Sequence, residues 1–502
     1  MKTKIRNLFL KLFVTALPFC LLFFLFVNNS ATAGTASRNS YAGNKAKYVF
    51  LFIGDGMGLP QVSAAEIYSG AGKNSKYPDG SRVLSFTDFP SQGLTTTHDA
   101  SSFITDSASA GTAIACGYKT LNGVISMDVD KKIKYESISK KAKKNGMKVG
   151  IISSVSIDHA TPATFYSNQP SRKNMYEISL ELADSGFDYF AGGSVDDPDG
   201  KKSKMQNKPG NVFSYAKKKG YKIINSKKDF VKLNKKSGKV WVVTEQPADA
   251  ASMLYEIDRK NGVSSLADFT KKGIEVLDNE NGFFMMVEGG KIDWACHAND
   301  GMSAIRDTFA FSEAVQHAVD FAKKHPAETL IVVTGDHECG GMTIGFAGTQ
   351  YDTFFNKLNS QKVSFAKFDE DFSKMKAKSN LTFDSVMPLI TKYFGLKTGK
   401  GGDMDLTGYE MDLLKTAFAE SLKDAKSRTN DENSAIIYGS YEPLTVTITH
   451  ILNRKAGIGW TTYSHTGVPV PTYAYGTGNE IFNGFYDNTD IYGKMAAVMN
   501  IK

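Results

Sequence analysis

Residues 283–297, with the sequence FFMMVEGGKIDWACH, contain side chains that are well suited to metal chemistry. The apolar run at the start of this stretch predicts a buried strand, which Glu288 ends. Asp293 and His297 are four residues apart, so on a helix they lie on one face. Carboxylate and imidazole groups at that spacing are typical ligands of a divalent cation. The stretch therefore predicts a cation site just beyond the end of a strand.

Three other apolar runs, residues 48–53, 149–152 and 329–333, also lead into polar residues of ligand type. Runs of this kind between helical segments predict parallel strands that are covered on both faces. Ligands of such sheets bind beyond the carboxyl ends of the strands, so we expect these polar side chains to meet at one edge. The side chains that this edge would gather are Asp55, His159, Glu288, Asp336 and His337.

The elements around these runs predict an α/β fold, a three-layer sandwich with a central, mostly parallel sheet, helices on both faces and a large insertion. The insertion is expected at residues 343–454, which contain no cluster of ligand-type residues, within a catalytic domain formed by residues 34–342 and 455–502. We interpret the insertion as a cover for the site or as a dimer contact. Helices are predicted at residues 107–115, 135–144, 172–183, 248–260, 266–278 and 305–324.

The first 33 residues have the pattern of a secretory signal peptide. Lys2, Lys4, Arg6 and Lys11 form a basic part, an apolar run of residues 12–27 follows, and A-x-A at residues 31–33 is a cleavage site. An uncleaved membrane anchor is the competing interpretation, but the apolar run is short for a full span. We therefore expect a periplasmic or secreted protein with no membrane segment after cleavage.

The cysteine count argues against a fold held together by disulfides, and the charge pattern argues against nucleic-acid binding. Cys116, Cys296 and Cys339 follow the signal sequence, and three cysteines allow at most one intramolecular disulfide. Cys296 and Cys339 lie beside ligand-type residues, but we expect them to be small buried residues rather than zinc ligands. The formal net charge is +8, and the lysine-rich stretches at residues 131–148 and 201–236 lack interleaved aromatic residues. We therefore expect no nucleic-acid partner.

A candidate nucleophile lies in residues 105–113, with the sequence TDSASAGTA. Asp106 can cap a helix that begins at Ser107, and the small residues that follow allow close packing. A serine at a helix N-terminus meets partial positive charge and free N–H groups, which also suit a phosphate. No G-x-S-x-G motif surrounds Ser107, so activation by a metal fits better than a Ser–His–Asp triad.

Together these motifs resemble those of the alkaline phosphatases, in the same order along the chain. The resemblance extends from about residue 47 to the C-terminus, apart from the insertion. The matching motifs are GDGMG at residues 54–58, TDSASAGTA at 105–113, NG at 122–123, HATP at 159–162 with SRK at 171–173, VEGGKIDWACH at 287–297, TGDHE at 334–338, SHTG at 464–467 and TDIY at 489–492.

The resemblance implies two zinc ions and one magnesium ion per subunit, a homodimer, Ser107 as the nucleophile and Arg172 as the clamp on two phosphate oxygens. It also implies that two positions vary in the family, where this chain has His159 and Trp294, as in a subset of bacterial members with a large insertion. The implied ligands are Asp293, His297 and His465 for the first zinc, Asp55, Asp336 and His337 for the second, and Asp55, Thr161 and Glu288 for magnesium, with His159 nearby.

The expected activity is hydrolysis of small phosphate monoesters through a phosphoserine, which releases inorganic phosphate and an alcohol. One alternative is a phosphodiesterase or sulfatase of the same superfamily, although no C-x-P-S-R sulfatase motif is present. A second alternative is a periplasmic protein that binds metal or phosphate without catalysis. The histidines that match no ligand motif are expected to be structural or solvent-facing, and they are His98, His317, His325 and His450.

Overall fold

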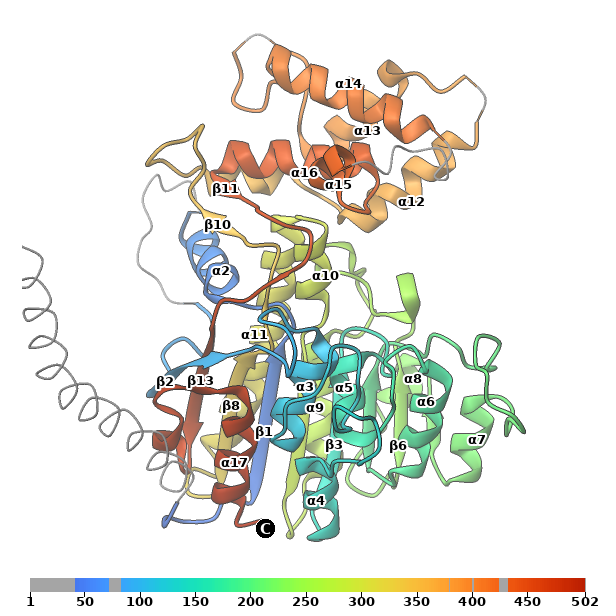
Figure 1. Ribbon diagram of the computed structural model, residues 1–502, viewed down its shortest axis with the longest axis vertical. Helices are drawn as coiled ribbons and strands as arrows, with labels where there is room; N and C mark the ends of the chain where they lie inside the picture. Colours follow the sequence, from blue (N-terminus) through green and yellow to red (C-terminus); the bar gives the residue numbers. More distant parts are fainter. Residues whose placement is uncertain (1–40, 72–82, 379, 400, 424–431, 502) are drawn as a thin grey trace, which may run out of the picture. The chain divides into compact units, whose positions relative to one another are not determined.

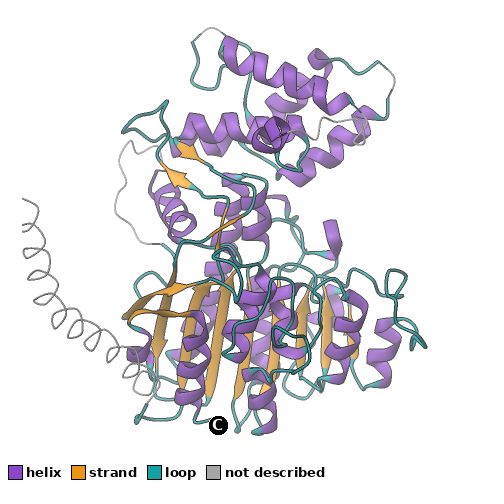
Figure 2. Ribbon diagram, viewed as in Figure 1, coloured by secondary structure: helices purple, strands orange, loops and turns teal. Residues whose placement is uncertain are grey.

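A ten-stranded, mostly parallel sheet lies at the centre of the computed structural model (Figures 1 and 2). Only β13 runs antiparallel to its neighbours, β2 and β8, among the strand pairs of this sheet in the described residues. The order of strands is β14 (Gly484–Asp487), β2 (Ser91–Thr96), β13 (Val470–Gly476), β8 (Thr329–Gly335), β1 (Tyr48–Gly54), β7 (Phe283–Glu288), β3 (Lys148–Ser153), β4 (Tyr189–Gly192), β6 (Val240–Val243) and β5 (Lys222–Ile224).

The structure describes residues 41–71, 83–378, 380–399, 401–423 and 432–501. The expected signal peptide, residues 1–33, lies outside them. None of the described helices has the length and apolar character needed to cross a bilayer.

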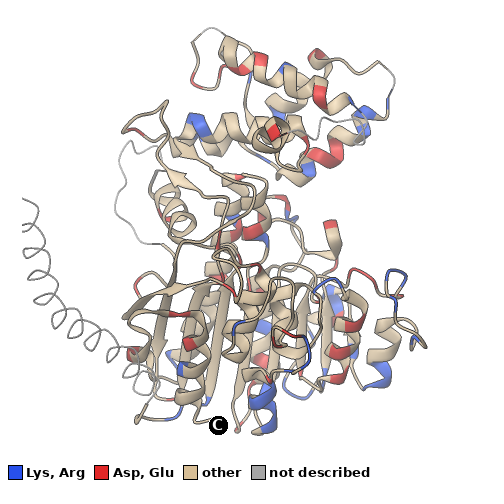
Figure 3. Ribbon diagram, viewed as in Figure 1, with Lys and Arg blue, Asp and Glu red and all other residues tan. Residues whose placement is uncertain are grey.

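The four apolar runs predicted from the sequence are β1, β3, β7 and β8, which lie side by side in the sheet. Every residue of β1, β7 and β8 is buried. Burial of one Phe, Met or Val side chain contributes about 1.5–3 kcal/mol, so these strands make a large part of the core. In Figure 3 the strands at the centre of the sheet are almost free of charged residues.

Helices cover both faces of the sheet. Phe283 and Phe284 are successive residues of β7, so their side chains point to opposite faces. The Phe283 ring lies 5.6 Å from Phe321 of α11 (Gly301–Ala322), and the Phe284 ring lies 6.3 Å from Phe165 of α5 (Ala160–Tyr166). The predicted three-layer sandwich is therefore confirmed.

The remaining elements surround this sheet or lie in the expected insertion. Within the described residues, 3-10 helices span Asp249–Ala251 (η1), Glu256–Asp258 (η2), Phe355–Ser360 (η3) and Asn479–Phe482 (η4). The remaining α-helices are α2 (Leu59–Ala71), α3 (Ser107–Cys116), α4 (Ile138–Lys144), α6 (Met175–Asp184), α7 (Val212–Lys218), α8 (Lys227–Phe230), α9 (Leu266–Leu277), α10 (Lys291–His297), α12 (Phe365–Lys376), α13 (Phe383–Phe394), α14 (Gly408–Leu422), α15 (Glu432–Tyr438), α16 (Pro443–Ala456) and α17 (Asn488–Met499).

The helix predicted at residues 248–260 is wrong. The chain forms only η1 and η2 there, and Ala250 and Ala251 have positive φ angles of 45° and 60°. A side chain from outside residues 248–260 stabilises this non-helical conformation. Lys291 is fully buried, and its Nζ binds Asp249 Oδ1 at 3.2 Å and Ser252 Oγ at 2.9 Å, which holds the segment open.

Three predicted helices are present with shifted ends, and capping side chains fix where two of them, α4 and α11, begin. The helix predicted at 135–144 begins at residue 138, where Ser137 accepts a hydrogen bond from the Lys140 N–H. The helix predicted at 305–324 begins at residue 301 behind the cap Asp300 and ends at residue 322. The helix predicted at 172–183 begins only at residue 175, so Arg172 lies in the turn before it.

Two short antiparallel strand pairs flank the segment expected to be an insertion. β9 (Glu338–Cys339) pairs with β12 (His465–Thr466), and β10 (Thr343–Ile344) pairs with β11 (Ile458–Gly459). The chain between β10 and β11 contains η3 and the helices α12 to α16. The boundaries of the insertion at residues 343 and 454 stay a prediction.

Candidate active site and metal centre

The carboxyl ends of neighbouring parallel strands bring the ligand-type residues together. The register places Gly54 of β1 beside Gly335 of β8, and Glu288 of β7 beside both Ile53 and Ser153. Asp55 follows β1 directly, and Asp336 and His337 follow β8 directly. The sheet therefore forms the edge that the sequence predicts.

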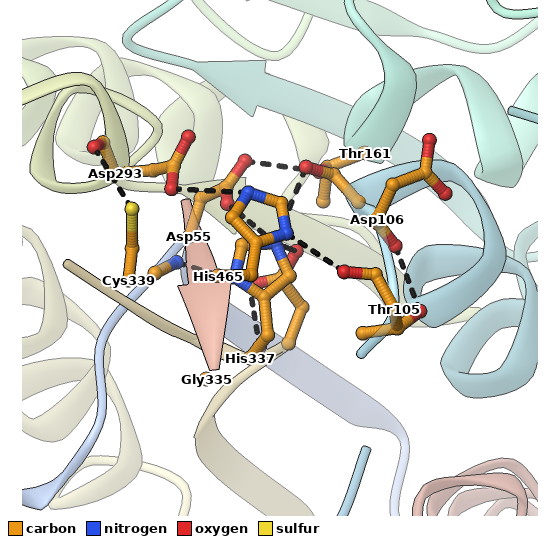
Figure 4. Close-up of polar contacts among 12 residues, drawn as sticks. Asp55, Thr105, Asp106, Thr161, Asp293, Gly335, His337, Cys339 and His465 are labelled. Atoms are coloured by element: carbon orange, nitrogen blue, oxygen red, sulfur yellow. Dashed lines mark hydrogen bonds and ion pairs between the residues drawn. The ribbon is translucent and has the colours of Figure 1, made fainter. Parts of the chain in front are cut away.

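Asp55, Asp336 and His337 form one fully buried group of possible metal ligands. His337 Nε2 lies 3.3 Å from Asp55 Oδ1 and 3.2 Å from Asp336 Oδ2. Burial raises the pKa of both carboxyl groups and lowers the pKa of His337. The other oxygen of Asp336 accepts a hydrogen bond from the Gly56 N–H at 3.1 Å, which fixes the carboxylate at the strand end. Figure 4 shows Asp55 and His337 in this arrangement.

Asp293, His297 and His465 form a second group, and Cys339 lies within reach of it. The helix predicted for the Asp293–His297 pair is α10, and His297 Nε2 lies 3.3 Å from Asp293 Oδ2. His465 Nε2 lies 3.6 Å from Asp293 Oδ1 and 3.1 Å from His297 Nε2. Burial lowers the pKa of His297, but the Asp293 carboxylate outweighs it and raises that pKa to about 9.

The backbone fixes how both histidines of this second group are oriented. The Nδ1 atoms of His297 and His465 lie 2.6 and 2.7 Å from the carbonyl oxygens of Tyr463 and Thr105, so each Nδ1 donates its proton outward. The two Nε2 atoms face each other across the group, 3.1 Å apart. Both can turn a lone pair toward one cation when that cation displaces the proton that the raised pKa of His297 keeps on its ring. The arrangement therefore fits a bound metal ion.

A third group consists of Asp55, His159 and Glu288, with Thr161 beside it. Thr161 Oγ1 donates to Asp55 Oδ2 at 3.3 Å, and Ser153 Oγ donates to Glu288. Burial raises the pKa of Glu288 to about 7. Asp55 is shared between this group and the group of Asp336 and His337, and the His337 ring stacks on the His465 ring with centroids 3.5 Å apart, so all three groups lie in one centre.

Buried carboxylate oxygens that accept no hydrogen bond support the fit to cations. One carboxylate oxygen has no hydrogen-bond partner among the described residues in each of Asp55, Glu288, Asp293 and Asp336. Buried carboxylates at this density repel one another, and a bound cation removes the cost. Imidazole nitrogen and carboxylate oxygen suit zinc in the first two groups, and the oxygen-rich third group suits magnesium.

Ser107 is the first residue of α3, as the sequence predicts, and Asp106 caps that helix by accepting from the Ser109 N–H at 3.0 Å. Ser107 is buried, and its Oγ lies 3.4 Å from His337 Nε2. The small residues of α3 allow it to pack tightly on α5. A Cβ added at Gly111 would lie only 2.9 Å from Thr164 Oγ1.

Arg172 reaches the same cavity from the turn before α6. Its Nη1 donates to Asp106 Oδ2 at 2.9 Å, and its Nη2 donates to His159 Nε2 at 3.0 Å. A guanidinium group is always a donor, so His159 Nε2 is an acceptor and the proton of the neutral ring lies on Nδ1. Burial, with the Arg172 charge, lowers the pKa of His159 to about 3, which keeps this ring neutral.

A cavity of about 410 Å³ contains the reactive groups. Ser107, Arg172, His297 and His465 are among the residues that line it. An anionic molecule that carries a phosphoryl group could therefore contact the serine hydroxyl, the guanidinium and the candidate metal ligands at once.

Comparison with known proteins places this geometry in a family. The family model described as alkaline phosphatase matches residues 46–501. Alkaline phosphatase 4 of Bacillus subtilis is 33% identical over 451 residues, covering 88% of this chain and 86% of the relative. Alkaline phosphatase 3 of the same organism is 34% identical, covering 89% of this chain and 88% of the relative.

The chain belongs to the alkaline phosphatase family.

Solved structures agree with this membership. The cold-active alkaline phosphatase of Shewanella sp. is 27% identical with a TM-score of 0.70, covering 90% of this chain and 99% of that one. The alkaline phosphatase of Thermus thermophilus is 22% identical with a TM-score of 0.76, covering 94% and 95% of the two chains, and shows the shared fold.

The site residues predicted for this alkaline phosphatase lie around the one centre. The four remaining histidines lie outside the metal groups. His98 pairs with Asp487, and His450 Nε2 lies 2.8 Å from Asn299 Oδ1. His325 stacks on Phe321 and His317 is half-buried.

The residues assigned from the sequence that meet at the centre are Asp55, Ser107, His159, Thr161, Arg172, Glu288, Asp293, His297, Asp336, His337 and His465.

The sequence did not single out several residues that line the cavity of this alkaline phosphatase. Asp249 and Tyr255 come from the segment wrongly predicted as a helix, and Phe365 and Tyr441 come from the expected insertion. No local pattern identifies them. Cys339 was interpreted as a small buried residue, and its Sγ also lies within 4.8 Å of the ligand atoms of the Asp293 group. The described cysteines, Cys116, Cys296 and Cys339, are all free and buried.

Proposed function

We propose that this alkaline phosphatase hydrolyses small phosphate monoesters with Ser107 as its nucleophile. Ser107 Oγ attacks phosphorus in line, the alcohol leaves, and the phosphoryl group stays on the serine. Water then attacks the phosphoserine, which releases inorganic phosphate and restores the serine, so one water is consumed for each ester cleaved. The position of Ser107 at the start of α3 supports this role, since N–H groups there favour a phosphate.

Arg172 would bind two oxygens of the phosphoryl group. Its planar fork suits such paired contacts. Asp106 and His159 accept from its two terminal nitrogens and so hold the fork in one orientation. His159 Nδ1 then carries the ring proton and has no hydrogen-bond partner among the described residues, which supports contact with that metal through water rather than by direct ligation.

The proposed metal content is two zinc ions and one magnesium ion per subunit. Asp293, His297 and His465 would hold the first zinc, and the buried group of Asp55, Asp336 and His337 the second. Asp55, Thr161 and Glu288 would hold magnesium. When bound, the zinc ions would lower the pKa of the serine hydroxyl and of water and neutralise phosphoryl charge, and magnesium would orient Asp55. The unpaired oxygens of these carboxylates support the proposal.

The observation that carries the proposal is that Ser107 Oγ lies 3.4 Å from His337 Nε2, beside the buried group of Asp55, Asp336 and His337 and at the wall of the cavity. The test is to quench the enzyme with acid during turnover of an aryl phosphate and locate phosphate on the chain by mass spectrometry. The label should lie on Ser107, and Ser107→Ala should remove both label and turnover. Ser101→Ala, at an exposed serine of the preceding loop, is the matched control. A label on another residue, or turnover retained in Ser107→Ala, overturns the assignment.

The same protein tests the alternative functions. A phosphodiesterase would cleave the methyl diester of an aryl phosphate faster than the monoester. A sulfatase would cleave the corresponding aryl sulfate. A protein that only binds metal or phosphate would retain zinc and cleave none of these esters. Arg172 and the third metal group support the monoester, because together they neutralise a doubly charged phosphoryl group.

We also propose a homodimer in which exposed apolar residues next to the site take part. Phe103 is 89% exposed and Ile104 is 47% exposed, only a few residues before Ser107. Val468 is 47% exposed, and the neighbouring Gly467 approaches Phe103 closely. Light scattering should give twice the chain mass, and Phe103→Asp should lower it to the chain mass. A monomer in the unmodified protein contradicts this proposal.

We also propose that the protein is exported to the periplasm or the medium. The chain would divide into a catalytic domain, formed by residues 34–342 and 455–502, and an insertion at residues 343–454. The basic and apolar parts of residues 1–33 support export. Cell fractionation with sequencing of the mature N-terminus tests it, and a protein retained in the cytoplasm with residues 1–33 intact contradicts it.

A further inference from the structure

The cavity beside Ser107 is also lined by side chains that the phosphoryl group does not need. Tyr255, Trp294, Phe365 and Tyr441 line it with aromatic rings, and Asp249 supplies a carboxylate. We call these five residues the aromatic end. The whole cavity, about 410 Å³, lies in the size range of sites that enclose an organic molecule, roughly 300–1,000 Å³. It is therefore large enough for the alcohol half of a substrate as well as the phosphate.

The insertion provides two of these rings, and contacts with the rest of the chain hold Phe365 in place. The Phe365 N–H donates to Asp300 Oδ2 at 2.9 Å, and Asp300 also caps α11. The ring of Phe365 lies 5.5 Å from that of Tyr255 and 6.0 Å from that of Tyr441, both edge-on. Aromatic pairs at these separations attract each other, so the wall is preorganised.

Lys291 determines the charge of the aromatic end. Its Nζ is buried 3.7 Å from the centre of the Tyr255 ring and 4.6 Å from that of Trp294, and it also binds Asp249 Oδ1. The Lys291 ammonium and the Asp249 carboxylate form an ion pair, so the aromatic end carries no net charge and offers no unpaired counter-charge to a charged leaving group. The Asp249 side chain is 46% exposed, so its carboxylate can still accept hydrogen bonds from a bound molecule. The chemistry that fits is a neutral, planar ring that carries hydrogen-bond donors.

We propose that the aromatic end is a leaving-group subsite for nucleosides, so that nucleoside 5′-monophosphates are preferred over phosphate esters without a ring. The base would pack against Phe365 and Tyr441, and its amino group or the ribose hydroxyls would donate to Asp249. This inference rests on the proposed hydrolysis of phosphate monoesters and adds a substrate class to it.

The test compares adenosine 5′-monophosphate with ribose 5-phosphate, which has the same phosphorylated sugar and no base. The unmodified enzyme should have a kcat/KM about tenfold or more higher for the nucleotide, mainly through a lower KM, since stacking of a base on one aromatic ring is worth a factor of that order. Tyr441→Leu and Phe365→Leu should lower kcat/KM for the nucleotide about five- to tenfold and leave ribose 5-phosphate within about twofold.

Leucine keeps apolar bulk and removes the ring, so thermal unfolding of these variants should stay close to that of the unmodified protein. Tyr351→Leu is the matched control, because Tyr351 is a fully exposed tyrosine of the insertion that does not line the cavity. Equal kcat/KM for the two substrates in the unmodified enzyme overturns the subsite, and so does an equal loss on both substrates in the variants. Failure to cleave either ester overturns the proposed hydrolysis itself.

Discussion

Replacement of Arg172 tests how the site holds a phosphoryl group. Arg172 lines the cavity with only 24% of its side chain exposed, and its two terminal nitrogens are held by Asp106 and His159. In the proposed complex it donates two hydrogen bonds to phosphoryl oxygens. A hydrogen bond to a charged group contributes about 1.5–3 kcal/mol, so Arg172→Ala removes roughly 3–5 kcal/mol of transition-state binding.

That loss corresponds to a fall of about 10²- to 10⁴-fold in kcat/KM. Arg172→Lys keeps the positive charge and loses the planar fork, so it should lose about one of the two contacts and fall roughly tenfold. Inhibition by inorganic phosphate should weaken in the same order, because phosphate makes the same contacts as the substrate.

Initial rates with an aryl phosphate, together with the inhibition constant for phosphate, measure both effects. Lys173→Ala is the matched control, since Lys173 is the exposed neighbour and its removal changes the net charge equally. The reasoning is refuted if Arg172→Ala stays within about threefold of the unmodified enzyme, or if Lys173→Ala loses as much as Arg172→Ala.

Two further predictions concern stability. Removal of metal should lower the midpoint of thermal unfolding, because the buried carboxylates of Asp55, Glu288, Asp293 and Asp336 lose the cations that neutralise them. A ligand present at about 1,000 times its Kd stabilises the folded protein by roughly 4 kcal/mol. Calorimetry should therefore show a large fall in the unfolding midpoint when a chelator is added and its recovery when zinc is added back. An unchanged midpoint would refute the metal assignment. Burial lowers the pKa of His450 to about 4, below the usual value near 6.5, so the unfolded chain binds more protons and this residue makes stability fall as pH decreases from about 6.5 to 4. His450→Gln should remove this penalty, which reaches roughly 2 kcal/mol at pH 5. The free energy of unfolding of the variant, taken relative to that of the unmodified protein, should therefore rise between pH 7.5 and pH 5, and a pH-independent difference would contradict this.

Much of the site could be predicted because its determinants are local. An apolar run buried on both faces predicts a strand wherever it lies, and the residue after the strand must emerge at the sheet edge. β1, β7 and β8 follow this rule and place Asp55, Glu288 and Asp336 together. The spacing of Asp293 and His297 is likewise a property of one helix, and Asp106 caps α3 through residues adjacent in sequence.

The errors arose where distant residues decide the local conformation. Residues 248–260 have a composition compatible with a helix, but the buried Lys291 binds Asp249 and Ser252 and keeps the segment open. Arg172 was placed inside a helix that begins three residues later. Its N–H donates to the carbonyl oxygen of Gly123 at 2.7 Å, a contact across the sequence that holds the turn.

The sequence by itself determined the four central strands, the capped helix that begins at Ser107 and the types of residue that can bind metal, because periodicity and capping act over a few residues. Only the tertiary structure decided that Phe365 and Tyr441 would lie in the same cavity as Ser107. Their contacts depend on how Asp300 and Tyr255 pack against the segment between β10 and β11. Packing between residues far apart in the chain leaves no periodic pattern in the sequence, so the reach of this cavity beyond the phosphate could not be predicted from it.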